Sequence, residues 1–129
     1  MNNSEKIIGI LPCSGACNVG IMTTKATVKA CEAHKNVNFV CALGLPLGIP
    51  GIIENAKKSD AYLALNGCEI RCATKALESV GIKPDDEIVV SEKCDMKKNK
   101  NFSDETGLDV LMEEVENFIR KWSQNFYAS

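Results

Sequence analysis

Seven cysteines are the residues of this 129-residue chain whose type and spacing point most directly to chemistry. Four of them form two C-x₃-C pairs, Cys13 with Cys17 and Cys68 with Cys72. This spacing lies within the C-x₂₋₄-C range that is common in zinc sites, although it is less diagnostic than C-x₂-C. In a secreted chain such an excess predicts disulfides, whereas in a reducing compartment it indicates metal or redox chemistry.

Six of the seven cysteines follow segments that are typical of β-strands. Short and nearly continuous apolar runs predict four strands, at residues 6–11, 37–43, 61–65 and 87–91. Each strand has a cysteine near or just beyond its end, namely Cys13, Cys41, Cys68 and Cys94. Cys17 and Cys72 lie four residues after a strand-end cysteine, where the next helix is expected to begin.

Helical patterns separate the strands, at residues 18–34, 52–58, 70–80 and 106–126. The last of these keeps apolar residues on one face, among them Phe118, Trp122 and Phe126, and Thr106 with Asp109 resembles a capping box. The alternation predicts one three-layer α/β domain over residues 1–129, with a mostly parallel four-stranded sheet and helices on both faces. A flavodoxin-like order, 2-1-3-4, is favoured, and a Rossmann-like order, 3-2-1-4, is the alternative.

This topology gathers the cysteines. In a parallel sheet all junctions from strand to helix lie at the carboxyl edge, where open α/β sheets bind ligands. Helix N-termini point their free N–H groups at the same edge, and their field stabilises thiolates. We therefore expect at least four thiolates in one site, with zinc as the favoured metal and an iron–sulfur cluster as the alternative. Cys31 falls within a helix away from this edge, and we expect it to serve packing.

Composition and charge exclude several classes of protein. The net charge of −2 and the presence of only two arginines, Arg71 and Arg120, argue against a nucleic-acid partner. Every apolar stretch is far shorter than the roughly 20 residues that span a bilayer, so no membrane span is expected. The apolar run after the polar N-terminus is too short for a signal peptide, and we expect a cytoplasmic protein.

Several ordered stretches together match a known family. They are Cys13-Ser14-Gly15-Ala16 with Asn18-Val19-Gly20, Cys41-Ala42-Leu43-Gly44, Leu65-Asn66-Gly67-Cys68 with Cys72-Ala73, Ile53-Glu54-Asn55-Ala56-Lys57, and residues 89–98. Over about residues 6–100 the chain resembles the DGC domain family, small proteins that are expected to bind zinc and are named for an Asp-Gly-Cys motif. The resemblance implies four metal-binding cysteines, which correspond to Cys13, Cys41, Cys68 and Cys72.

Two departures from the family pattern bear on the site. Asn66 stands in place of the name-giving aspartate, which removes a carboxylate that could act as a ligand or base. Cys17 and Cys94 are additions to the four cysteines of the family, and they are candidate additional ligands. Six thiolates would favour a second metal, a cluster or thiol exchange.

Three functions therefore remain open. The first is a zinc-binding protein that acts as a metal carrier, a sensor or a structural site. The second is a redox or sulfur-transfer enzyme that uses paired cysteines through disulfide, persulfide or iron–sulfur states. The third is an interaction module whose metal only stabilises the fold. The residues next to the cysteines form no general acid–base set, so the sequence assigns no catalytic residue.

Overall fold

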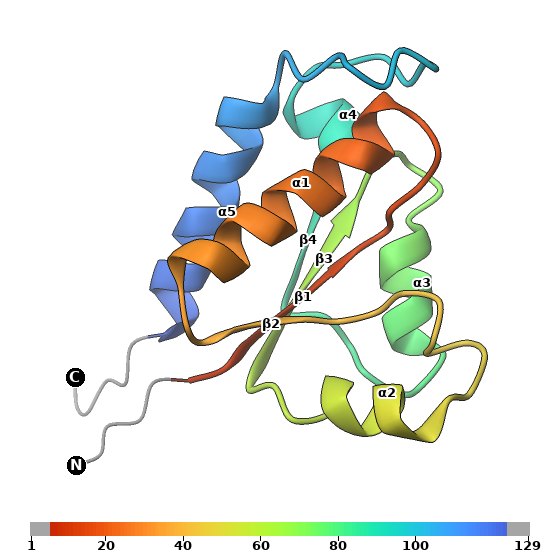
Figure 1. The fold of residues 1–129 in the computed structure, drawn as a ribbon, viewed down its shortest axis with the longest axis vertical. Coiled ribbons are helices and arrows are strands. Elements are labelled where there is room, and N and C mark those ends of the chain that lie inside the picture. Colours follow the sequence, from red (N-terminus) through yellow and green to blue (C-terminus); the bar gives the residue numbers. More distant parts are fainter. Residues whose placement is uncertain (1–5, 124–129) are drawn as a thin grey trace.

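Strands and helices alternate along the chain in the computed structural model, which describes residues 6–123 (Figure 1). In chain order the elements are β1 (Ile8–Pro12), α1 (Asn18–Ala33), β2 (Val37–Phe39), α2 (Pro50–Ala56), β3 (Ala61–Asn66), α3 (Cys72–Glu78), β4 (Asp86–Val89), α4 (Val90–Lys93) and α5 (Leu108–Ser123). The predicted α/β class with a parallel sheet and helices is confirmed.

The sheet has four parallel strands in the order β2-β1-β3-β4. This is the 2-1-3-4 order favoured from the sequence, and the alternative 3-2-1-4 order does not form. The two central strands are the most buried, since every residue of β1 and every residue of β3 except Tyr62 is buried. The pairing of Ile10 with Leu63 sets the register between them. The junctions that follow β1 and β3 therefore lie side by side at the carboxyl edge.

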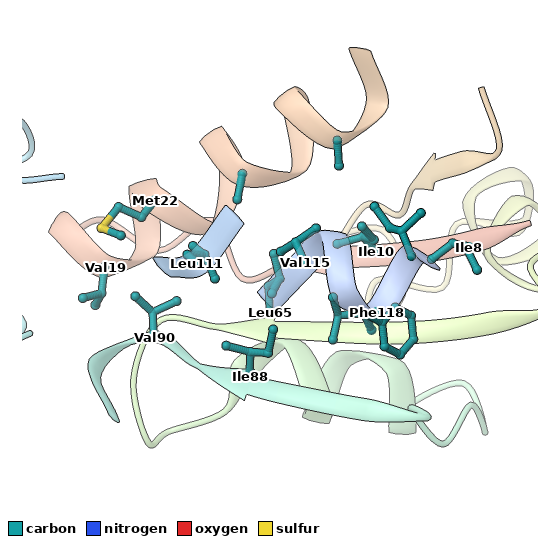
Figure 2. Close-up of a cluster of buried hydrophobic side chains, with 14 of the residues drawn as sticks. Ile8, Ile10, Val19, Met22, Leu65, Ile88, Val90, Leu111, Val115 and Phe118 are labelled. Carbon is teal, nitrogen blue, oxygen red and sulfur yellow. The ribbon is translucent and has the colours of Figure 1, made fainter. Parts of the chain in front are cut away.

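Helices cover both faces of the sheet, with α1 and α5 on one side and α2 and α3 on the other (Figure 1). Successive strand residues point to opposite faces, so Ile10 packs under α1 and α5 whereas Leu11 packs under α3. Figure 2 shows the larger core, in which Leu65, Val115 and Phe118 meet between the sheet and α5. The site region is thus built on a rigid, apolar support.

The second strand is shorter than predicted. It ends at Phe39 instead of residue 43, although the Val40 N–H still donates to the Ile10 carbonyl oxygen at 2.9 Å. Beyond it the chain folds into turns, and Gly44 packs so closely against the side chain of Ile52 that a Cβ at Gly44 would lie 2.3 Å from it. The Gly/Pro-rich segment therefore forms a compact loop next to α2 and does not extend the sheet.

The chain after the fourth strand also differs from the prediction. The expected strand at 87–91 ends at Val89, and the short helix α4 follows directly. Helix α5 begins at Leu108, later than predicted, so Thr106 is not its N-cap residue and the predicted capping box with Asp109 is wrong. The N–H and the hydroxyl of Thr106 instead donate to Asp104, at 3.2 Å and 2.7 Å. The end of the predicted helix, with Phe126, lies outside the described residues. Among residues 6–123, no helix combines the length and apolar character needed to cross a membrane.

Candidate functional site

Five predicted cysteines lie where a strand leads into the next helix, at the carboxyl edge of the sheet. Cys13 directly follows β1, and Cys17 is the residue before α1. Cys41 comes two residues after β2, Cys68 comes two residues after β3, and Cys72 is the first residue of α3. The predicted placement of these residues at junctions of strand and helix is confirmed.

The loop after β1 is folded back onto the first turns of α1. Ser14 has a positive φ of 56°, and its N–H donates to the hydroxyl of Thr23 at 3.2 Å. Thr23 is fully buried, and its hydroxyl donates a hydrogen bond to the Gly20 carbonyl oxygen at 2.6 Å. The same hydroxyl oxygen lies 3.8 Å from the sulfur of Cys13. Thr23 thus connects the cysteine to the body of the helix.

The loops after β1 and β3 touch, and glycines allow this contact. A Cβ at Gly20 would lie 2.5 Å from the Gly15 carbonyl oxygen, and a Cβ at Gly67 would lie 3.0 Å from the Gly20 nitrogen. At this contact the Gly67 N–H donates to the sulfur of Cys13 at 3.3 Å. Cys13 therefore meets the backbone of the segment that carries Cys68 and Cys72.

Asn66 holds the loop after β3 against α3. Its side chain is fully buried, and its Oδ1 accepts the backbone N–H groups of Ala73 at 2.9 Å and Thr74 at 3.2 Å. Arg71, which precedes the helix, has a φ of 61° and makes no capping hydrogen bond with its own side chain. Asn66 therefore satisfies the first turn of α3 from the end of the preceding strand. Sequence reasoning noted Asn66 only as a missing carboxylate.

The same loop is also tied to β4 through Glu87. The Thr74 hydroxyl donates to Glu87 Oε1 at 2.7 Å, and Arg71 Nη1 donates to the same oxygen at 3.0 Å. The hydrogen bond from Thr74, helped by Arg71, holds the pKa of Glu87 below its usual range, although partial burial opposes the shift. No sequence signal singled out Glu87, because its partners come from a different element of the chain.

A shallow groove of about 370 Å³ opens between the first and second junctions and α3. It is lined by Cys13, Ala42, Leu43, Pro46, Cys72, Lys75 and Ala76. Cys13 and Cys72 thus face the same space, and Ala42 is the neighbour of Cys41 in the chain. Cys41 and Cys72 are exposed, so reagents in solution can reach them.

Positive charge reaches this edge from the chain that follows α4. Lys98 Nζ donates to the sulfur of Cys68 at 3.7 Å. The segment is anchored by Asn18, which is fully buried, accepts the Asn99 N–H at 2.7 Å and donates to the Lys97 carbonyl oxygen at 2.8 Å. Lys97 and Lys98 are exposed, and Lys98 places an ammonium group beside a candidate ligand.

Cys17 and Cys94 occupy a different environment from the four family-like cysteines. Cys17 is buried in the core under α1 and α5, and Cys94 packs against the same core. The Cys94 thiol donates to the Gly107 carbonyl oxygen at 3.4 Å. Burial raises the pKa of Cys94, and Glu114 adds to this effect while Lys93 opposes it. Both thiols contribute to packing here, and their role as additional ligands stays a prediction.

Cys31 lies far from the candidate ligands along the chain and in the fold. It sits in the last turn of α1, and its thiol lies 3.9 Å from the carbonyl oxygen of Val37 at the start of β2. Burial, and secondarily Glu32, raise the pKa of Cys31. This end of the sheet is opposite to the carboxyl edge, as the sequence predicted.

The side chains at the edge do not form a closed coordination shell. Across residues 6–123, no three side chains of His, Cys, Asp or Glu are arranged so that they could hold one metal ion. The fold brings the chain segments of the candidate ligands to one edge, and sulfur is the donor that zinc and iron–sulfur clusters prefer. The prediction of a four-cysteine site therefore depends on side chains that must turn toward a common point.

Fold and site together define a class: three-layer α/β proteins with cysteines at successive junctions of strand and helix. The family model of the DGC domain matches residues 9–121, so the chain belongs to the DGC domain family. The match begins close to the predicted start at about residue 6, extends past the predicted end at about residue 100, and includes most of α5. Searches of curated proteins and of solved structures gave no significant match.

Proposed function

We propose that the chain is a zinc-binding protein in which Cys13, Cys41, Cys68 and Cys72 hold one zinc ion. The observation that carries the proposal is the contact between two cysteine-bearing junctions, where the Gly67 N–H donates to the sulfur of Cys13 at 3.3 Å. Membership of the DGC domain family supports a metal-binding role for the chain. Ala42, the neighbour of Cys41 in the chain, lines the groove beside Cys13 and Cys72, which supports including Cys41 in the proposed site.

The surroundings of these thiols suit a thiolate metal site. Four thiolates around Zn²⁺ carry an excess of negative charge, and N–H donors and cations near the sulfurs offset it. The Gly67 N–H and the Lys98 ammonium are such groups, at Cys13 and Cys68 respectively. Cys41 and Cys72 are exposed and can change rotamer without disturbing the core. A shell of four cysteines leaves no open position, so a carrier, sensor or structural role fits better than catalysis.

A redox or sulfur-transfer function is the second candidate, and one observation favours it. Cys13 and Cys72 line a common groove that is open to solvent, so a small thiol or disulfide could reach both. In thiol exchange, the thiolate of one cysteine would attack an external disulfide, forming a mixed disulfide and releasing the first thiol. The other cysteine would then attack the mixed disulfide, forming a disulfide within the protein and releasing the second thiol, so that the external disulfide is reduced as the two cysteines are oxidised. This function predicts reversible pairwise oxidation and does not require bound metal.

Metal analysis of protein purified without oxygen tests the proposal. We expect one zinc per chain, and we expect Cys68→Ser to lose it. Cys31→Ala is the matched control, because Cys31 lies at the edge of the sheet opposite to the four candidate ligands. Retention of zinc in Cys68→Ser would overturn the four-cysteine assignment. A brown protein with visible absorption would indicate an iron–sulfur cluster instead.

The double variant Cys17→Ser with Cys94→Ser tests the additional ligands. Since structural zinc is almost always tetrahedral, we expect this variant to keep its zinc. Halved metal content would show that the site holds two ions and that Cys17 and Cys94 contribute ligands. Metal-to-protein ratios of the two variants, Cys68→Ser and the double variant, separate these outcomes.

A further inference from the structure

Asn66, Thr74 and Glu87 form a chain of hydrogen bonds beneath the loop that carries Cys68 and Cys72. Asn66 Nδ2 donates to Thr74 Oγ1 at 2.9 Å, and the Thr74 hydroxyl donates to Glu87 Oε1 at 2.7 Å. We infer that Asn66 is a positioning residue for the metal site. It acts through these two hydrogen bonds, from Asn66 to Thr74 and from Thr74 to Glu87, which we call the relay. The inference rests on the proposed function, since it concerns two of the proposed ligands.

The relay holds both ends of the cysteine loop. Asn66 is the last residue of β3, and its Oδ1 accepts N–H groups from the second and third residues of α3. The hydrogen bond between Asn66 and Ala73 thus closes a loop of six residues, 67–72, which contains both Cys68 and Cys72. Asn66 is 0% exposed and Thr74 is 8% exposed, so water has little access to replace these bonds. Arg71 adopts the left-handed region, which non-glycine residues occupy only when surrounding contacts hold them there.

Which group donates and which accepts in the relay is set by the single proton of the Thr74 hydroxyl. A threonine hydroxyl has one proton to donate, and its oxygen also accepts. The amide of Asn66 occupies the acceptor side of Thr74, so the proton of Thr74 is available to Glu87. An aspartate at position 66 would have no N–H to give. That aspartate and Glu87 would then compete for the single Thr74 proton, and two carboxylates would face one hydroxyl.

The relay therefore requires a hydrogen-bond donor at position 66 when position 87 carries a carboxylate. Asn66 stands where the name-giving motif of the family has an aspartate, so the substitution that restores the motif should disrupt the relay. Changing Glu87→Gln at the same time reverses the relay, because the introduced glutamine amide can donate to Thr74 while Thr74 donates to the introduced aspartate. A carboxylate oxygen at position 66 can still accept the N–H groups of Ala73 and Thr74. The double variant should therefore recover what Asn66→Asp loses.

Four proteins test the inference: the unchanged chain, Asn66→Asp, Glu87→Gln and the double variant. Zinc affinity is measured by competition with a chromophoric chelator, and thermal midpoints are recorded on the same samples. We expect Asn66→Asp to weaken zinc binding by about 10- to 100-fold, as changes next to metal ligands typically do. We expect the double variant to regain most of this loss. Additive effects of the two substitutions on affinity would overturn the relay.

A control separates positioning from general stability. Val115→Ala truncates the core under α1 and α5, which does not include the cysteine loop. It should lower the thermal midpoint and leave zinc affinity close to that of the unchanged chain. If Val115→Ala weakened zinc binding as much as Asn66→Asp at an equal loss of midpoint, Asn66 would be merely structural.

Substitutions at Thr74 provide a second test of the relay, which can be used if Asn66→Asp does not fold. Thr74→Ser retains the hydroxyl and should behave like the unchanged chain, whereas Thr74→Val removes both relay bonds and should weaken zinc binding. Equal affinities for these two variants would overturn the inference. The failure of the proposed function is distinct, because then the unchanged chain itself would bind no zinc.

Discussion

Six of the seven cysteines fall into two regions that place the same side chain in opposite surroundings, and Cys31 lies apart from both. At the carboxyl edge, the sulfurs of Cys13 and Cys68 meet a backbone N–H and an ammonium group, and Cys41 and Cys72 are exposed. In the core under α1 and α5, Cys94 packs among apolar side chains and burial raises its pKa.

This contrast shows that position decides what a cysteine can do. Burial without donors disfavours the thiolate, which is the form that binds metal and reacts, whereas donors and cations favour it. A count of cysteines therefore overstates the size of a site, and the groups next to each sulfur are the better guide. The core region should govern stability and the edge region should govern metal binding.

The largest expected effect is on stability, from truncation of the core. Phe118→Ala removes a ring that is 5% exposed between α5 and the sheet, and it should lower the free energy of unfolding by about 3–5 kcal/mol. Zinc content per folded chain should not change, because the edge loops stand apart from this helix. Urea denaturation with metal analysis checks both, and loss of zinc from folded Phe118→Ala would break the separation of the two regions.

A smaller effect should come from the contact between the loop after β1 and the first turn of α1. Gly20→Ala places a Cβ 2.5 Å from the Gly15 carbonyl oxygen, so the loop after β1 must shift, at a cost of roughly 1–3 kcal/mol. Zinc affinity should fall as well, because Cys13 moves with the loop.

The matched control for Gly20→Ala is Gly51→Ala. A Cβ at Gly51 in α2 meets nothing within 4 Å, and an added methyl in a helix should stabilise the chain by about 0.4–1 kcal/mol. Unchanged zinc affinity in Gly20→Ala would show that the loop contact does not position Cys13. Both variants are compared by urea denaturation and by chelator competition.

Removal of the metal should affect the edge and spare the sheet. The chain has its own hydrophobic core, unlike zinc fingers, which unfold without metal. Chelation should therefore speed amide hydrogen exchange in the loops after β1 and β3 while far-UV circular dichroism changes little. Loss of the helical signal on chelation would show instead that the metal is required for folding.

The smallest expected effect is a dependence on pH at Glu87. Its pKa in the folded chain lies below the ordinary value of about 4.3, chiefly because Thr74 donates to it. This group therefore contributes stability that is present above the ordinary pKa and is lost as pH falls through the folded pKa. The contribution should be no more than about 1 kcal/mol, since solvent screens a side chain that is 35% exposed.

Acid unfolding of the unchanged chain and of Glu87→Gln measures this contribution. The stability difference between the two proteins should shrink as pH falls below about 4.3. A difference that stays constant down to strongly acid pH would show that the charge of Glu87 does not contribute.

The sequence by itself predicted the order of the elements and the edge at which five cysteines lie. Both follow from local signals, since continuous apolar runs indicate buried strands and the alternation with helices requires parallel crossovers. The end of α3 is a further example, because Gly81 adopts a φ of +80° where the helix was predicted to stop.

Only the tertiary structure decided which groups surround each sulfur. Thr74 donates a hydrogen bond to Glu87 on the next strand, and Asn18 accepts one from Asn99, which is 81 residues away along the chain. Cys17 follows the same junction as Cys13 and yet turns into the core, because it lies where α1 packs against the sheet. Such contacts depend on side-chain direction and on partners distant in sequence, and periodicity carries no information about either.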